Sequence, residues 1–141
     1  MRNRKYYTGK VKEQPIYSTN EICIGMIDIN GVEKKLYQKT WTGLTLPATS
    51  TEGTIITTYT ALGTDIDTVY DFKAFARTSD GYMDMSLPIA LKGEVVAIAR
   101  IYRNGSNHPN SIELKNSAPN WNNSAVWVTV QYTKSWPTAD K

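Results

Sequence analysis

Apolar residues recur at every second position over short runs of this chain, which is the period of a β-strand. Residues 93–103 (GEVVAIARIYR) carry one row of Val95, Ala97, Ala99 and Ile101 and a second row between them. Residues 125–134 (AVWVTVQYTK) repeat the pattern with valines and a tyrosine on one face. Successive side chains of a strand point to opposite faces, so both runs predict strands.

Turn signals separate the runs. Asn30-Gly31 stands between residues 22–29 and 33–41, and this dipeptide is typical of a two-residue type I′ turn. These residues therefore predict a β-hairpin. Further strands are expected over residues 53–62, 68–76, 87–91 and 111–115, with 87–91 as an edge strand because of its proline.

About seven or eight strands at this spacing predict an all-β fold, an antiparallel β-sandwich of jelly-roll-like form. We expect three parts in the chain: a short basic amino-terminal arm or linker over 1–15, the β-sandwich domain over 16–136 and a tail over 137–141. The length of 141 residues is enough for one domain with a workable core.

The positive charge is concentrated at the start of the chain. Residues 1–13 hold five basic residues and one acidic residue, a net charge of +4, whereas the whole chain has a net charge of +3. The remainder is thus at −1. A nucleic-acid-binding fold carries its basic face on the folded body, so nucleic acid is an unlikely partner.

The single cysteine, Cys23, excludes an internal disulfide, and its apolar surroundings predict a small core residue. No apolar stretch reaches the roughly 20 residues that a membrane-spanning helix needs, and no secretory signal is recognisable, so membrane insertion is not expected.

Two segments carry a family resemblance. Residues 17–40 contain Tyr-Ser-Thr-Asn-Glu, the Asn30-Gly31 turn and Leu-Tyr-Gln-Lys-Thr, and residues 130–134 read Val-Gln-Tyr-Thr-Lys. Together they resemble the carboxy-terminal β-sandwich domain of bacteriophage and prophage virion fibres, of the tail-fibre or head-fibre type. The middle of the chain adds only a compatible strand rhythm. Met26-Ile27 stand where the family has a tryptophan, and the turn is longer here.

The resemblance implies a non-enzymatic virion structural protein, made in the cytoplasm of a bacterial host. It implies a fibre or decoration module, frequently a homotrimer, that attaches to the host surface or to the particle. Residues 1–15 would then contact other virion proteins. No catalytic residue and no cofactor come with the motif.

The residues themselves offer little for catalysis or metal binding. His108 is the only histidine, and one histidine with one distant cysteine makes a poor metal set. The acidic residues Asp65, Asp67, Asp71, Asp80 and Asp84 lack the spacing of a calcium loop, and we expect solvated turn and strand-edge carboxylates.

The loops between 104 and 124 are rich in asparagine and hold the one candidate binding site. Amides beside an aromatic ring are suited to a saccharide, and asparagine is also the usual residue of turns. The residues considered for glycan contact are Asn107, His108, Asn120, Trp121 and Asn122. Trp41, Trp127 and Trp136 are expected in the core or between subunits.

Two alternatives remain open at this point. The chain could be a carbohydrate-binding or carbohydrate-cleaving β-sandwich of cellular origin. It could also bind single-stranded nucleic acid through the basic and aromatic residues 2–7.

Overall fold

The protein folds as two packed antiparallel β-sheets in a computed structural model that describes residues 17–104 and 109–135. The described residues form nine strands and one short 3-10 helix. In chain order they are β1 (Ile22–Ile29), β2 (Val32–Thr45), β3 (Ile56–Ala61), β4 (Thr68–Arg77), β5 (Asp84–Ser86), β6 (Ile89–Leu91), β7 (Glu94–Asn104), β8 (Pro109–Asn116), η2 (Pro119–Trp121) and β9 (Ala125–Thr133). The predicted all-β sandwich is confirmed. No α-helix long and apolar enough to cross a bilayer occurs among these residues.

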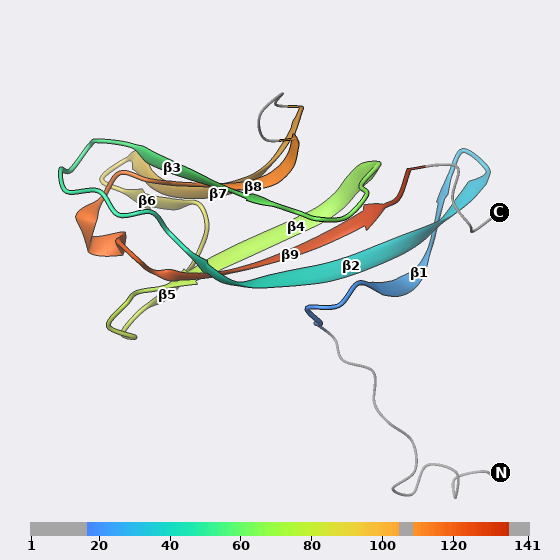
Figure 1. The fold of residues 1–141 in the computed structure, drawn as a ribbon, viewed down its shortest axis with the longest axis horizontal. Helices are drawn as coiled ribbons and strands as arrows, with labels where there is room; N and C mark the ends of the chain where they lie inside the picture. The colour runs from blue at the N-terminus through green and yellow to red at the C-terminus, as the bar shows by residue number, and fades with distance from the viewer. Residues whose placement is uncertain (1–16, 105–108, 136–141) are drawn as a thin grey trace, which may run out of the picture.

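The two sheets have five and four strands. The five-stranded sheet has the order β1-β2-β9-β4-β5, and the four-stranded sheet has the order β3-β8-β7-β6. Figure 1 shows them as two layers, with the β1–β2 hairpin reaching past the end of the other strands. The arm at 1–15 and the tail at 137–141 lie outside the described residues, as does Trp136.

The core lies between the sheets and follows the predicted alternation. β9 buries Val126, Val128, Val130 and Tyr132, each at most 1% exposed. β8 meets them from the other sheet with Ile112 and Leu114. The remaining buried apolar residues come from the loops and the other strands, namely Leu46, Leu62, Ile66, Ala74, Ala76, Ile89, Ala97, Ala118 and Trp121.

The β1–β2 hairpin has the predicted turn. Asn30 and Gly31 have φ of 53° and 83°, so both central residues have the positive φ of a type I′ turn. The Asp28 carboxylate accepts a 2.8 Å hydrogen bond from the Gly31 amide and braces the turn. The register then pairs Ile29 with Val32 and continues to Ile22 with Gln38.

Cys23 is exposed, so its prediction as a core residue is wrong. The cause is the place of β1, an edge strand of the hairpin that projects beyond the other sheet (Figure 1). An apolar run there has no opposite layer to pack against. Ile24, Met26 and Ile29 are accordingly 42–56% exposed.

One further expectation needs adjustment. A ninth strand, β5, was not predicted, and it is a three-residue edge strand beside β4. The pairing of β4 with β9 has a register shift between Val69 and Asp71, and it is regular from Asp71 to Arg77. Phe75 therefore keeps a regular place on the outer face of the sheet.

We expect Leu114→Ala to lower the free energy of unfolding by about 2–5 kcal/mol, because Leu114 is 2% exposed and its removal leaves a cavity between the sheets. Leu91→Ala is the matched control, since Leu91 is 43% exposed and should cost less than about 0.5 kcal/mol. Urea denaturation of both variants measures the difference. Equal losses would contradict the position of the core.

Candidate functional site

The outer face of the five-stranded sheet holds a groove of about 320 Å³. Because β9 turns its valines inward, Trp127 and Thr129 point outward, and Phe75 and Lys73 do the same on the neighbouring β4. Thr40 of β2 and Tyr17, just before β1, complete the lining. The site is thus built on three adjacent strands and on Tyr17 of the segment before β1.

An aromatic pair dominates the groove. Phe75 and Trp127 are register partners, and their rings stack with centroids 5.0 Å apart and an interplanar angle of 13°. Phe75 remains 43% exposed and Tyr17 52% exposed. Stacked rings of this kind provide a large, rigid apolar surface for a partner.

Arg77 borders the aromatic pair. Its guanidinium carbon lies 6.0 Å from the centre of a Trp127 ring. Asp84 of β5 fixes this arginine through two hydrogen bonds, of 2.7 and 3.0 Å, to its Nε and Nη2. These bonds lower the pKa of Asp84 below its usual value.

Polar cross-strand pairs continue the face away from the rings. The hydroxyls of Thr40 and Thr129 are 2.8 Å apart, and Gln131 Nε2 donates a 2.9 Å bond to Gln38 Oε1. Each of these four side chains thus has a hydrogen-bond partner within the sheet. Lys73 is the one charged side chain among the described residues that line the groove. The groove is therefore suited to an apolar or aromatic group with a polar edge.

A second polar cluster is centred on Glu21. Its carboxylate accepts hydrogen bonds from the Tyr132 hydroxyl at 2.5 Å, Lys134 Nζ at 2.6 Å and the Thr64 hydroxyl at 3.0 Å. Lys134 also lies 4.8 Å above the Tyr37 ring, which stacks on Tyr132 with centroids 6.2 Å apart. The cluster ties the segment before β1 to the end of β9.

The cluster shifts two pKa values in opposite directions. Burial alone would raise the pKa of Glu21, but the hydrogen bonds from Lys134, Tyr132 and Thr64 outweigh it, so the pKa lies below 4.5. Burial, and then the bond to Glu21, raise the pKa of Tyr132 far above its usual value. Tyr132 therefore stays a neutral donor and Glu21 a charged acceptor, so the hydrogen bond between them has a structural role.

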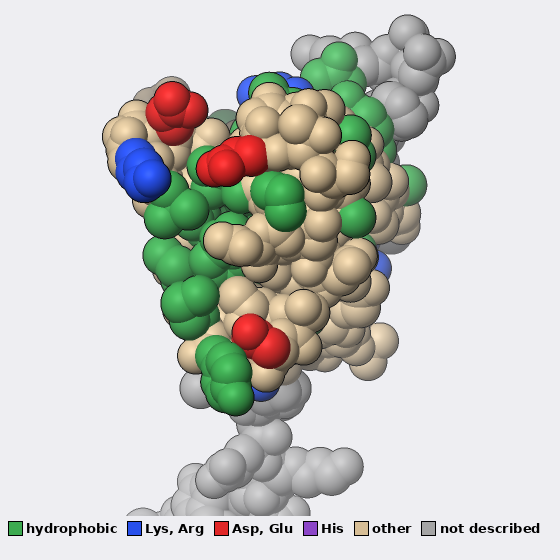
Figure 2. Space-filling view, turned by 90° about the vertical axis from the view of Figure 1, so that its left-hand side faces the viewer, with side chains coloured by type: hydrophobic (Ala, Val, Ile, Leu, Met, Phe, Trp, Pro, Cys, Tyr) green, Lys and Arg blue, Asp and Glu red, His purple; other side chains and the backbone are tan. Residues whose placement is uncertain are grey.

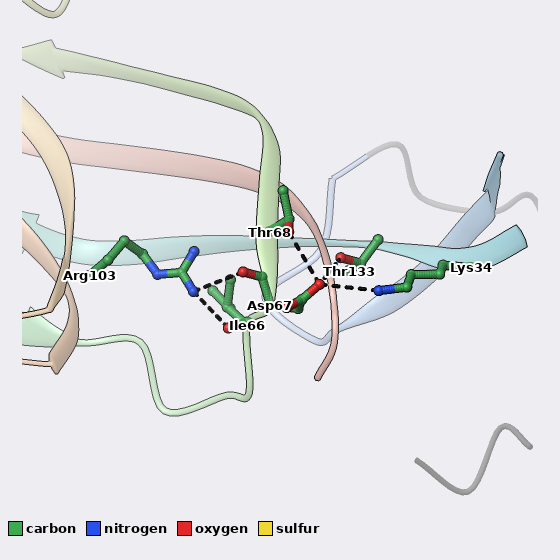
Figure 3. Close-up of polar contacts among 6 residues, drawn as sticks. All are labelled: Lys34, Ile66, Asp67, Thr68, Arg103 and Thr133. Carbon is green, nitrogen blue, oxygen red and sulfur yellow. Dashed lines mark hydrogen bonds and ion pairs between the residues drawn. The ribbon is translucent and has the colours of Figure 1, made fainter. Parts of the chain in front are cut away.

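A third cluster fastens the crossover from β3 to β4 (Figure 3). Asp67 Oδ2 lies 3.2 Å from Lys34 Nζ, 3.2 Å from the Thr68 hydroxyl and 3.5 Å from the Thr133 hydroxyl. Arg103 reaches from the other sheet and donates to the carbonyl oxygens of Ile66 at 2.8 Å and Asp67 at 3.0 Å. The Lys34 bond, foremost, lowers the pKa of Asp67. The Asp67 carboxylate thus ties the crossover to β2 and β9 of the five-stranded sheet, and Arg103 ties it to β7 of the other sheet.

Glu113 lies on the outer face of the four-stranded sheet, yet it is buried, with an exposed fraction of only 2%. Burial by itself would raise its pKa, but hydrogen bonds from Arg100 and Tyr59 lower it. The rings of Tyr59 and Tyr102 lie on the same face of the sheet, with their centroids 5.7 Å apart. Because the Glu113 carboxylate is buried and already hydrogen-bonded, its role is to stabilise the sheet.

The described residues among the predicted glycan contacts do not present an exposed aromatic surface. Trp121 is 3% exposed and belongs to the core, so its ring offers no platform for a sugar. Asn122 binds the Thr49 backbone twice, through Nδ2 to the carbonyl at 2.8 Å and through Oδ1 from the amide at 2.9 Å. Asn120 is exposed, whereas Asn107 and His108 lie outside the described residues.

The predicted acidic residues are dispersed. Asp80 accepts from the Thr78 hydroxyl at 2.6 Å and the Tyr82 amide at 3.0 Å in the β4–β5 turn, which lowers its pKa. Asp67 and Asp84 belong to separate clusters, while Asp65 and Asp71 are exposed. Within residues 17–104 and 109–135, no group of three or more acidic, cysteine or histidine residues could hold a metal ion.

The aromatic groove was not predicted as a site, although the alternation contained the signal. Trp127 lies out of phase with the valines of its own strand, and Phe75 lies out of phase with Ala74 and Ala76. Each of these two strands thus has a large aromatic residue among the side chains that point to solvent, which is the signal of a binding surface on the outer face. Their pairing requires knowing that β4 and β9 are neighbours.

No protein-family model, no curated protein and no solved structure matches this chain.

We expect Asn122→Ala to lower the free energy of unfolding by about 1–3 kcal/mol, because it leaves the Thr49 amide and carbonyl without their partner. Asn120→Ala, two residues away and exposed, should leave stability unchanged. Thermal denaturation followed by circular dichroism compares them. A silent Asn122→Ala would show that the amide is available for a ligand.

The Glu21 cluster predicts a pH dependence. A carboxylate with a lowered folded-state pKa stabilises the protein above about pH 4.5, and this contribution is lost as the pH falls through the folded value. Glu21→Gln should therefore be less stable than wild type at pH 7 and should lose less stability between pH 7 and pH 3. Denaturation curves at several pH values test this. Parallel pH profiles for the two proteins would refute the assignment.

Proposed function

We propose that this chain is a non-enzymatic assembly or attachment module of a bacteriophage particle, a fibre or decoration subunit that works as a homotrimer. The proposal starts from the resemblance of residues 17–40 and 130–134 to virion-fibre domains. The observation that carries it is the exposed apolar edge strand β1. A partner subunit, another virion protein or the host surface would meet surfaces of this kind.

Strand β1 has the properties of an interface strand. It has eight residues, its outer edge has no neighbour among the described strands, and it contains one acidic residue. Long apolar edges of this type drive association unless something covers them. Val32, the first residue after the turn, is 56% exposed and extends the apolar surface of the same hairpin.

A second apolar surface supports an assembled state. Figure 2 shows hydrophobic side chains gathered in a strip at the end of the molecule that carries β5 and β6. The exposed apolar residues of β5, β6, the β4–β5 loop and the start of β7 are Tyr82, Met83, Met85, Leu91 and Val95, at 37–86% exposure. Contiguous apolar surface on a small domain marks an interaction site.

The two segments that carry the resemblance form one unit in space. Tyr37 pairs with Tyr132 and Gln38 pairs with Gln131 across β2 and β9. Glu21 joins the same unit through Tyr132 and Lys134. Residues far apart in the sequence thus have a common physical role, which favours a shared domain design over a chance similarity of two short motifs.

Native mass spectrometry at micromolar concentration tests the proposal. We expect a trimer for the wild-type chain and a monomer for Ile24→Lys, because a charge placed on the apolar edge opposes its burial. Ser50→Lys adds the same charge on an exposed loop and should remain trimeric. A wild-type chain that is monomeric under these conditions would overturn the trimeric fibre.

A further inference from the structure

The aromatic groove lies where residues 1–16 join the described chain. Tyr17 lines the groove, and the Ser18 carbonyl accepts a 2.8 Å hydrogen bond from the Thr40 amide of β2. That bond fixes residue 18 to the edge of β2. Tyr17, the first described residue, therefore lies at the β2 side of the groove.

The distance across the groove corresponds to three residues. The groove extends from β2 across β9 to β4, which is two inter-strand spacings or about 10 Å. Three residues of extended chain span about 10 Å. Pro15 disfavours the helical conformation at residue 14 and has a fixed φ of its own, so residues 14–16 favour an extended path.

The chemistry of these residues matches the groove. Pro15 and Ile16 are apolar, and aromatic-lined grooves are common receptors for proline-containing segments in extended conformations. The exposed faces at Phe75 and Trp127 are the apolar surface that such a segment would cover. Residues 1–13, with a net charge of +4, are unsuited to a face that already carries Lys73 and Arg77.

We propose that residues 14–16 of the chain pack into its own aromatic groove, with Pro15 and Ile16 against Phe75 and Trp127, while residues 1–13 extend beyond it. Docking adds an apolar contact to the hydrogen bond between Ser18 and Thr40. The docked segment then fixes the position on the domain surface from which residues 1–13 extend. The inference does not rest on the proposed function, because a monomer and a trimer can both contain this contact.

Limited trypsin digestion of the full chain tests the proposal. Cleavage after Lys12 requires the residues on both sides of the bond to enter the protease, and docking of 14–16 opposes this. We expect docking in about nine of every ten molecules, and because cleavage follows the population of the open form, it should be about tenfold slower than in a chain without docking. Cleavage after Arg4 and Lys5 is the internal reference, since these bonds lie outside the docked segment.

The matched variants alter the groove or another aromatic surface. Trp127→Thr, and independently Phe75→Thr, should accelerate cleavage after Lys12 about tenfold and leave cleavage after Arg4 and Lys5 unchanged. Tyr70→Thr removes an aromatic residue of β4 that is 39% exposed and does not line the groove, so it should change none of the rates. Circular dichroism confirms that each variant is folded.

Two results would overturn the proposal. Equal Lys12 cleavage in wild type, Trp127→Thr and Phe75→Thr would mean that residues 14–16 do not occupy the groove. Protection of Lys12 that increases with protein concentration would mean that a second copy covers the groove. Protection that is independent of concentration and lost in both groove variants supports docking within one chain.

Discussion

The position of β9 in the middle of the five-stranded sheet is the constraint on which the rest of the structure depends. β9 is the last strand in the sequence, and it pairs with β2 on one side and β4 on the other. Without it, the β1–β2 hairpin and the β4–β5 pair have no edge in common. The sheet is therefore complete only when the end of the chain has paired with strands that precede it by 48 to 95 residues, from Arg77 with Ala125 to Tyr37 with Tyr132.

The alternation of β9 couples the core to the groove. Val126 and Val128 face the other sheet, so Trp127 between them must face outward. A register slip of one residue would exchange the two faces, placing the tryptophan in the core and the valines in solvent. The free energy that keeps the valines buried thus also fixes Trp127 beside Phe75. The groove has a defined shape because its β9 residues alternate with side chains that are fixed in the core.

The sequence predicted the elements well where a local rule determines them. The Asn30-Gly31 turn, the strand periods and the sandwich class all follow from local patterns, and the structure confirms them. Cys23 and Trp121 were misplaced because burial depends on the opposite layer. An apolar edge hairpin finds no layer, while an asparagine-rich loop folds its tryptophan into the end of the core. Asn122 illustrates the same limit, since its partner Thr49 is distant in sequence.

The groove escaped prediction for a related reason. The outward phase of Trp127 and of Phe75 can be seen in each strand alone, but their contact requires that β4 and β9 be neighbours in register. Eight strands of similar composition allow many pairings, and the turn signals specify only the adjacent ones. Where the chain returns to the middle of a sheet, the information lies in long-range packing.

The residues that carry the family resemblance have a structural explanation within this chain. Glu21, Tyr37, Tyr132 and Lys134 form one hydrogen-bonded and stacked cluster that joins the start of the hairpin to the end of β9. A carboxylate that accepts bonds from a buried tyrosine and a lysine closes the sheet around the last strand. This cluster specifies how the sheet is closed around its last strand. The Phe75–Trp127 groove and the apolar strip beside β5 and β6 involve other residues, so closing the domain does not use up its exposed apolar surfaces.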